Sequence, residues 1–65
     1  MIASHLTDRQ RHVLYVYGAT GSYKATAHEL GIARSTVRAT LADVRKRLDV
    51  PSSVQAVLIV FGRVA

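Results

Sequence analysis

Residues 22 to 48 read SYKATAHELGIARSTVRATLADVRKRL, and this spacing predicts two helices joined by a tight turn. Ala27 is small, as is needed where two helices approach each other closely, and Leu30 closes the apolar stripe of the first helix. Gly31 supplies the turn, because glycine adopts a left-handed backbone conformation without steric penalty. Val37 then returns the chain to the core. The stretch therefore contains both the turn between the two helices and the residues through which they pack.

The second of these helices, expected at residues 34 to 48, is apolar on one side only. The apolar residues follow at steps of four, three and four: Val37, Leu41, Val44 and Leu48. The remaining faces carry Arg34, Ser35, Arg38, Ala39, Ala42, Arg45 and Lys46. A short helix, a tight turn and a second helix with a basic outer face form the plan of a helix-turn-helix, which lays its second helix in the major groove of DNA.

The flanking sequence predicts a helix on each side of this unit. Thr7 and Gln10 form a capping box for a helix at residues 8 to 18, which we expect to end near Gly18. Ser22 caps the helix at residues 22 to 30, and a capping box from Ser52 begins a fourth helix at residues 52 to 63. We therefore expect one all-α domain over residues 1 to 65, with a three-helix core and a C-terminal fourth helix.

Composition narrows the function classes. A chain of 65 residues forms a small core with little room for a catalytic cavity, so we expect no enzymatic activity. Nine Lys and Arg against four Asp and Glu give a formal net charge of +5, which favours a polyanionic partner. There is no cysteine, and the histidines His5, His12 and His28 lack the spacing of metal ligands, so no metal or cofactor is expected. The sequence has no apolar run long enough to span a bilayer.

The order of these motifs resembles the LuxR-type (GerE-type) helix-turn-helix DNA-binding domain from Leu6 to about Val57. Its first-helix signature matches Leu6, Thr7, Arg9, Val13 and Leu14. The second-helix signature matches Ser22, Lys24, Ala27, Leu30 and Ile32, and the recognition-helix signature matches Thr36, Val37, Arg38, Leu41, Arg47, Leu48 and Val50. Departures include Gln10 for the usual Glu, Tyr23 for the usual Asn, and Ala33 for the usual capping Ser. These departures bear on the DNA sequence that is read more than on the fold.

The resemblance and the groove geometry together suggest base contacts. An arginine on a helix in the major groove can form two hydrogen bonds with guanine, and we expect this of Arg38, with Arg34 one turn earlier. Ala39 and Ala42 are short enough to lie against the groove floor. Alternatively, the two alanines are there because alanine favours helices.

Other residues are expected at the phosphates. Thr36 resembles the family's phosphate-contacting hydroxyl, with Lys24 and Arg9 as further anchors. The remaining expected phosphate contacts are Ser22, Ser35, Arg45 and Lys46. Each of them is alternatively a solvated surface residue. The helix that starts at Arg34 has no acid in its first turn, and Ala33 offers no capping oxygen, an arrangement that a bound phosphate would stabilise.

The fourth helix is apolar nearly all round. We expect Val54, Val57, Leu58 and Phe61 to face the core, and a homodimer interface on the other side at Ala56, Ile59, Val60 and Arg63. A dimer would read an inverted repeat. The alternative is that a flexible tail or a neighbouring domain covers the second side.

These observations favour a transcriptional regulator that binds double-stranded DNA in the cytoplasm of a bacterium, at its nucleoid, or in the host cytoplasm if a phage encodes it. Regulators of this type usually carry a receiver or ligand domain, which this sequence does not contain, so its activity would be controlled by its abundance, by a partner, or by a domain outside this sequence. Two alternatives remain open: a module like region 4 of a sigma factor, with RNA polymerase as partner, and a small protein-interaction module that uses the apolar fourth helix. Weak binding to random duplex at low salt would favour the interaction module.

Overall fold

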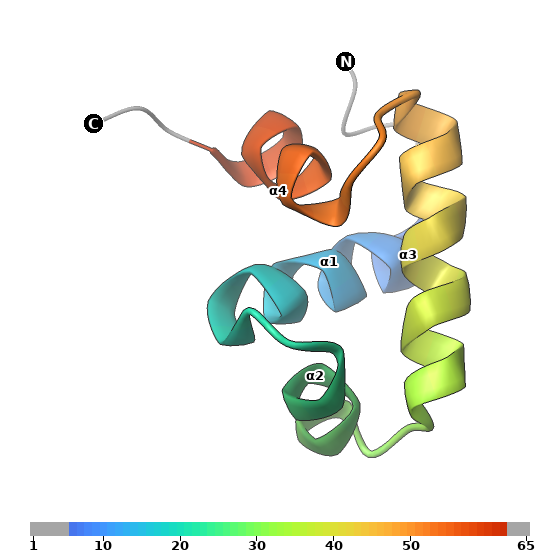
Figure 1. Cartoon of the computed structure of the whole chain (residues 1–65), viewed down its shortest axis with the longest axis vertical. Helices are drawn as coiled ribbons and strands as arrows, with labels where there is room; N and C mark the ends of the chain where they lie inside the picture. Colours follow the sequence, from blue (N-terminus) through green and yellow to red (C-terminus); the bar gives the residue numbers. More distant parts are fainter. Residues whose placement is uncertain (1–5, 63–65) are drawn as a thin grey trace.

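The computed structural model describes residues 6 to 62, and this part of the chain folds into four α-helices without strands. They are α1 (Asp8–Thr20), α2 (Tyr23–Leu30), α3 (Arg34–Leu48) and α4 (Ser53–Phe61). In Figure 1, α3 runs along one side of the molecule, and α1 lies between α2 and α4. Each of α1 and α3 packs against the other three helices. The expected all-α, four-helix architecture is confirmed.

No helix in residues 6 to 62 is long and apolar enough to cross a membrane.

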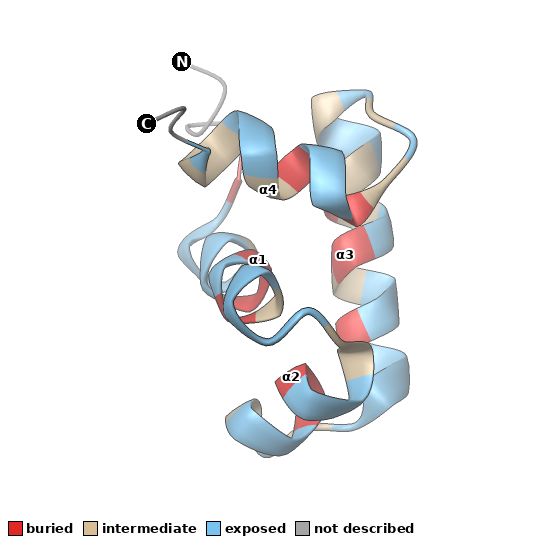
Figure 2. Ribbon diagram, turned by 60° about the vertical axis from the view of Figure 1, so that its left-hand side comes forward, coloured by how far each residue is buried: buried red, intermediate tan, exposed pale blue. Residues whose placement is uncertain are grey.

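The core lies where α1, α2 and α4 meet the inner side of α3, and Figure 2 shows the buried segments turned toward this space. The side chains of Leu14, Val37, Leu41 and Val44 are fully buried. Ala27, only 5% exposed, lies at the α2–α3 approach as its small size predicts. The helical spacing of α3 therefore identifies its buried side correctly.

Helix ends follow the capping residues. The Thr7 hydroxyl accepts a hydrogen bond from the Gln10 N–H, and the Gln10 side chain accepts one from the Thr7 N–H, which confirms the capping box. The hydroxyls of Ser22 and Ser52 accept in the same way, each from the N–H three residues later. Gly31 ends α2 in the left-handed conformation at φ 66°. These caps fix where three of the helices begin and how α2 turns into α3.

The expected end of the first helix near Gly18 is wrong. α1 continues to Thr20, and Gly21 (φ 74°) supplies the left-handed cap. Gly18 lies where α4 approaches α1, and a Cβ at this position would be 3.0 Å from Cγ1 of Val57. Gly18, inside α1, therefore allows α4 to pack closely against α1. Relative to alanine, a glycine within a helix costs about 1 kcal/mol of helix stability.

The expected orientation of the fourth helix is right for Val57 and Phe61, which pack against the core, and for the exposed Ile59, but it is wrong for the other described residues. Val54 and Leu58, predicted to face the core, are 57% and 62% exposed, whereas Ala56, predicted at an outer interface, is fully buried. The small Ala56 lets α4 pack closely on the core, and Ser53 next to it is held by Arg45 of α3 (Nη1 to Oγ, 3.0 Å). Because α4 is apolar nearly all round, these contacts set its rotation. The helix ends at Phe61, and its expected last residue, Arg63, lies outside the described residues.

Candidate nucleic-acid interface

α3 turns Val37, Leu41 and Val44 inward and leaves a continuous outer face exposed to solvent. Its 15 residues make it roughly 22 Å long, and an α-helix with its side chains fits a B-DNA major groove about 12 Å wide. The exposed residues of this face are Arg34, Ser35, Thr36, Arg38, Ala39, Ala42, Lys46 and Arg47. We call these eight residues the outer face of α3. The base-contact candidates Arg34, Arg38, Ala39 and Ala42 all belong to it.

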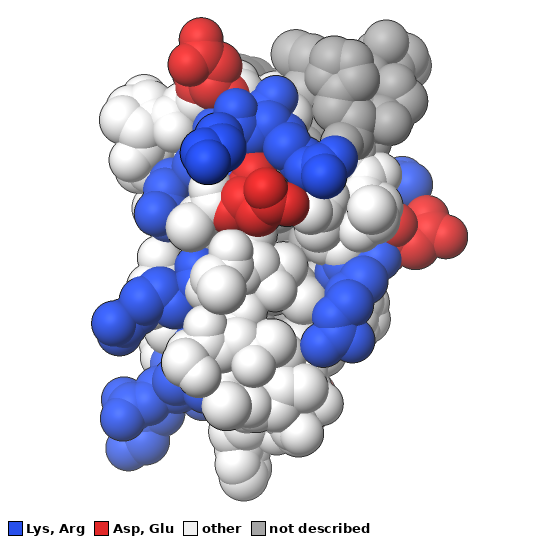
Figure 3. Space-filling model, turned by 90° about the vertical axis from the view of Figure 1, so that its right-hand side faces the viewer, with Lys and Arg blue, Asp and Glu red and all other residues white. Residues whose placement is uncertain are grey.

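Figure 3 views the molecule from the side of α3 and shows Lys and Arg side chains on both sides of an uncharged strip. Acidic atoms lie among the basic ones on this side. Asp43 is the one acidic residue of α3, and its carboxylate accepts hydrogen bonds from Nε2 of Gln10 and Nε of Arg47, the latter at 3.1 Å. These donors offset part of the negative charge that the carboxylate would present to a phosphate. The face therefore remains favourable to a polyanion.

Arg38 leaves α3 beside the start of α2. Its guanidinium carbon lies 6.0 Å above the ring centroid of Tyr23, within the usual limit of a cation–π contact. Arg38 is exposed, and it forms no ion pair with the described residues. Ala39 and Ala42 follow on the same exposed side and present no atoms beyond Cβ. Base edges on the floor of a major groove can therefore come close to the helix backbone between the arginines and Lys46.

The start of α3 is uncapped, as its sequence predicts. Ala33 makes no side-chain hydrogen bond to the helix, and the first turn contains no acid. The N–H groups of Thr36 and Val37 both donate to the Ala33 carbonyl, at 3.0 and 3.2 Å. Arg34, Ser35 and Thr36 are exposed around this end. Backbone dipole, guanidinium and hydroxyls together make it favourable to an anion.

Arg45 is engaged within the protein. It is half-buried, and its Nη1 donates to the hydroxyl oxygens of Ser53 (3.0 Å) and Tyr23 (3.4 Å). These bonds join α3 to the first turns of α4 and α2. The guanidinium of Arg45, which the sequence predicts at a phosphate, is therefore already hydrogen-bonded within the protein.

The residues expected to contact phosphate on α2 lie at its first turn. The Ser22 hydroxyl accepts from the Ala25 N–H at 3.0 Å, so its oxygen caps the helix, while Lys24 is exposed in the first turn. Thr26 is buried and donates its hydroxyl to the Ser22 carbonyl at 2.6 Å, which holds this end of α2 in place. Lys24 therefore presents its charge to solvent at a capped helix start.

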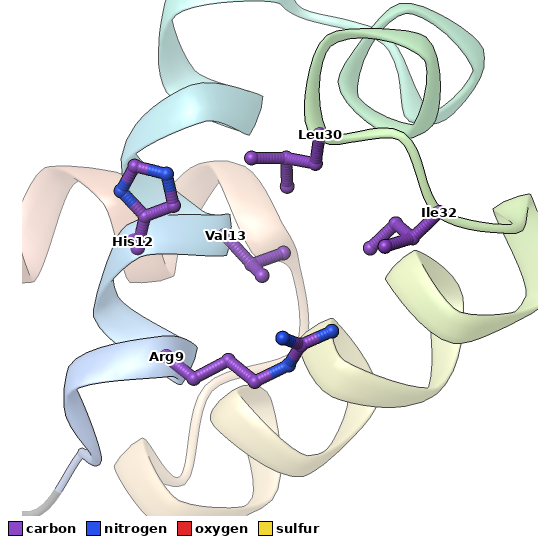
Figure 4. A pocket seen from close by; sticks show the side chains of 5 residues that line it. All are labelled: Arg9, His12, Val13, Leu30 and Ile32. Carbon is purple, nitrogen blue, oxygen red and sulfur yellow. The ribbon is translucent and has the colours of Figure 1, made fainter.

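Arg9 stands apart from these residues, on α1. Figure 4 shows its guanidinium extending toward α3, below Val13 and below Ile32 of the α2–α3 turn. Together with His12 and Leu30 these residues line an open cavity of about 260 Å³. Gln10, the residue after Arg9 on α1, bonds Asp43 of α3, whereas Arg38 of α3 lies over Tyr23 of α2. Arg9 therefore approaches α3 from a different side than the one on which Arg38 lies. The structure brings cations to both sides of the outer face of α3.

Sequence reasoning assigned no role to Tyr23, although this residue contacts several side chains of the site. The hydrogen bond with Ser53 lowers the pKa of Tyr23, with further lowering from the hydrogen bond and charge of Arg45 and from the charge of Arg38, while burial acts in the opposite direction. Tyr23 thus joins three polar side chains from α3 and α4. The sequence signal for a role of this residue was that position 23 carries a tyrosine where the LuxR-type family usually has an asparagine.

A short helix, a tight glycine turn and a second helix with an exposed, cation-flanked outer face define a helix-turn-helix DNA-binding domain. The family model described as "Bacterial regulatory proteins, luxR family" matches residues 4–60. The chain therefore belongs to the luxR family, whose domain binds DNA in transcriptional regulation and is not an enzyme. No curated protein and no solved structure shows significant similarity to the chain.

Proposed function

We propose that this protein is a sequence-specific regulator that places α3 in the major groove of double-stranded DNA. The outer face of α3 carries this proposal, since it presents the short residues Ala39 and Ala42 among exposed cations. Lys24 of α2 and Arg9 of α1 add exposed cations on the two other helices. Short side chains let the helix backbone approach the base edges, and the cations on both sides attract the two phosphate strands. No other helix of residues 6 to 62 has more than two Lys or Arg residues, whereas α3 has five.

Within this arrangement we assign base contacts to Arg38, Ala39 and Ala42, with Arg34 at the leading end. Arg38 supplies the two-pronged hydrogen bond to a guanine, and the alanines contact base edges or a thymine methyl. The exposure of all four residues on the outer face of α3 supports the assignment.

We assign phosphate contacts to residues around the edge of this surface. Thr36 and Ser35 stand at the uncapped start of α3, where free N–H groups add to their hydroxyls. Lys24 and Ser22 lie at the first turn of α2, Arg9 on α1, and Lys46 near the end of α3. Arg45 is assigned instead to holding α4, because its Nη1 is bonded to Ser53.

We further propose that two copies pair through α4 and bind an inverted repeat. The exposed apolar side chains of α4 are Val54, Leu58 and Ile59, and Tyr15 of α1 is 59% exposed on the neighbouring helix, its ring 5.5 Å from that of Phe61. Adjacent exposed apolar side chains favour burial against a second surface. A two-fold axis there would space the two α3 helices about 34 Å apart, one turn of DNA.

The assignment of Arg38 and Thr36 to different tasks gives the first test. Binding is measured by fluorescence anisotropy to the best site that the unmodified chain selects from random duplexes, to single-base-pair variants of that site, and to random duplex. Arg38→Ala should weaken the selected site by ~1 to 3 kcal/mol and remove the preference at one base pair, because it removes a base contact. Thr36→Ala should weaken all duplexes alike, because phosphates carry no sequence information.

Arg38→Lys is the matched control. It keeps the positive charge and loses the fork geometry, so it should bind random duplex normally and still lose the base preference. If Arg38→Ala weakens selected and random duplexes equally, Arg38 contacts phosphate and the base assignment is wrong.

A further inference from the structure

Tyr23 occupies the junction of all four helices. It is the first residue of α2, and its ring lies 5.3 Å from the ring of Tyr17 on α1. At the other end of the side chain, the hydroxyl lies 3.4 Å from the Ser53 hydroxyl of α4 and accepts from Nη1 of Arg45 on α3, also at 3.4 Å. Contacts at the ring and at the hydroxyl fix both the position and the tilt of the aromatic plane.

Arg38 is the residue that lies over this fixed plane. Its guanidinium carbon is 6.0 Å from the ring centroid, and the described residues give it no carboxylate partner. A long arginine side chain otherwise samples many rotamers at an exposed helix position, and ordering it on DNA costs entropy. An aromatic face that already holds the guanidinium reduces the number of rotamers to be lost.

We propose that Tyr23 is a positioning residue for DNA recognition, which holds Arg38 in the direction from which it reaches a base. The inference rests on the proposed base contact of Arg38. Tyr23 acts through its ring face, which the ring of Tyr17 supports, while its hydroxyl contacts Ser53 and Arg45. The residue thereby links the packing of α4 to the base-reading side of α3.

The test compares Tyr23→Leu and Tyr23→Phe, each in the unmodified chain and in Arg38→Ala. The measured quantity is the ratio of affinities for the selected site and for its variant at the base pair read by Arg38. Tyr23→Leu should reduce this ratio about two- to fivefold, the range of an exposed cation–π contact. Tyr23→Phe keeps the ring and should retain most of the ratio. In the Arg38→Ala background, Tyr23→Leu should change the ratio no further, because the two residues act as one unit.

The outcomes separate the two levels of the proposal. If Arg38→Ala removes the base preference and Tyr23→Leu leaves it intact, the inference is wrong and the proposed function stands. If Arg38→Ala itself leaves the preference intact, the base assignment fails first. If Tyr23→Phe reduces the ratio as much as Tyr23→Leu does, the ring face is not what holds Arg38 and the positioning role is overturned.

A measurement on the unmodified chain covers the case in which Tyr23→Leu does not fold. In proton NMR spectra, the side-chain resonances of Arg38 should be shifted upfield relative to those of the exposed Arg34, because Arg38 lies over an aromatic face. Tyr23→Phe should preserve this shift. Equal shifts for Arg38 and Arg34 would overturn the inference.

Discussion

Arg38 and Arg45 are two helical turns apart on α3 and point from the same side of it, yet their surroundings differ. Arg45 lies opposite the start of α4, so its guanidinium bonds Ser53 inside the domain. Arg38 lies over the ring of Tyr23 and forms no ion pair with residues 6 to 62, so its nitrogens remain available to DNA. The sequence pattern of α3 gives the side on which both arginines lie. It does not distinguish their roles, because these depend on which residue of another helix stands opposite.

Tyr23 makes a pH-dependent contribution to stability that follows from its lowered pKa. The hydrogen bond with Ser53 and the nearby Arg45 and Arg38 favour the phenolate in the folded state. Below the folded pKa both states are protonated and the group contributes nothing. As the pH rises through the folded pKa toward the unfolded value of about 10, the folded state gains stability. We therefore expect the free energy of unfolding to rise relative to Tyr23→Phe.

Urea unfolding of the chain and of Tyr23→Phe at about pH 7 and about pH 10 checks this expectation. The difference in unfolding free energy should widen in favour of the unmodified chain at the higher pH. A difference that stays constant or narrows would show that the arginines do not stabilise the phenolate.

At the scale of the helix, both ends of α3 carry cations, which suit the helix dipole at one end and oppose it at the other. Its last turn holds Arg45, Lys46 and Arg47, which suit the negative end of the helix dipole, whereas its first turn has a cation and no cap. Ala33→Ser should raise the free energy of unfolding by ~0.5 to 2 kcal/mol, because a hydroxyl at the N-cap would accept a hydrogen bond from an N–H group of the first turn. Thermal unfolding of the free domain measures this gain.

The matched control is Ala19→Ser, an alanine-to-serine change at an exposed position within α1. It offers no cap and should be neutral or slightly destabilising, since serine has the lower helix propensity. Equal effects of the two substitutions would contradict a free helix end at Ala33.

The sequence predicts those features of the helices that depend on residues close to one another in the chain. The serine and threonine caps, Gly31 and the stripe of α3 involve bonds or spacings within a few residues, so the sequence sufficed. Gly18 and the rotation of α4 are set by contacts between helices, namely Val57 against Gly18 and Arg45 against Ser53. A glycine that ends a helix and one that admits a neighbouring helix look alike in sequence.

At the scale of the whole molecule, the corrected orientation of α4 moves the proposed dimer contact to Val54, Leu58 and Ile59. Leu58→Asp should yield a folded monomer, because the side chain is 62% exposed and its replacement leaves the core intact while placing a charge in the contact. Sedimentation equilibrium at tens of micromolar protein measures the change. Binding to an inverted repeat should weaken in parallel.

Ala25→Asp, exposed on α2, is the control, and it should leave the dimer intact. A monomeric unmodified chain, or a dimer that persists in Leu58→Asp, would remove the proposed pairing.

The candidate interface was predictable from sequence as a surface but not as a set of contacts. Helical spacing places Arg38, Ala39 and Ala42 on the exposed side of α3, and the structure agrees on their exposure. Spacing along one helix cannot reveal that Arg9 of α1 extends toward α3, or that Gln10 bonds Asp43 across the domain. These depend on how α1 crosses α3.

The most direct test of DNA binding through the outer face of α3 is the dependence of duplex affinity on salt. Two protomers that neutralise about 6 to 10 phosphates should lose roughly a thousandfold or more in affinity between about 50 and 200 mM salt, because bound counterions are released. Lys46→Gln should reduce the slope of log affinity against log salt by about one unit for each protomer that loses the contact. A salt response that is flat in the unmodified chain would contradict DNA binding by this surface.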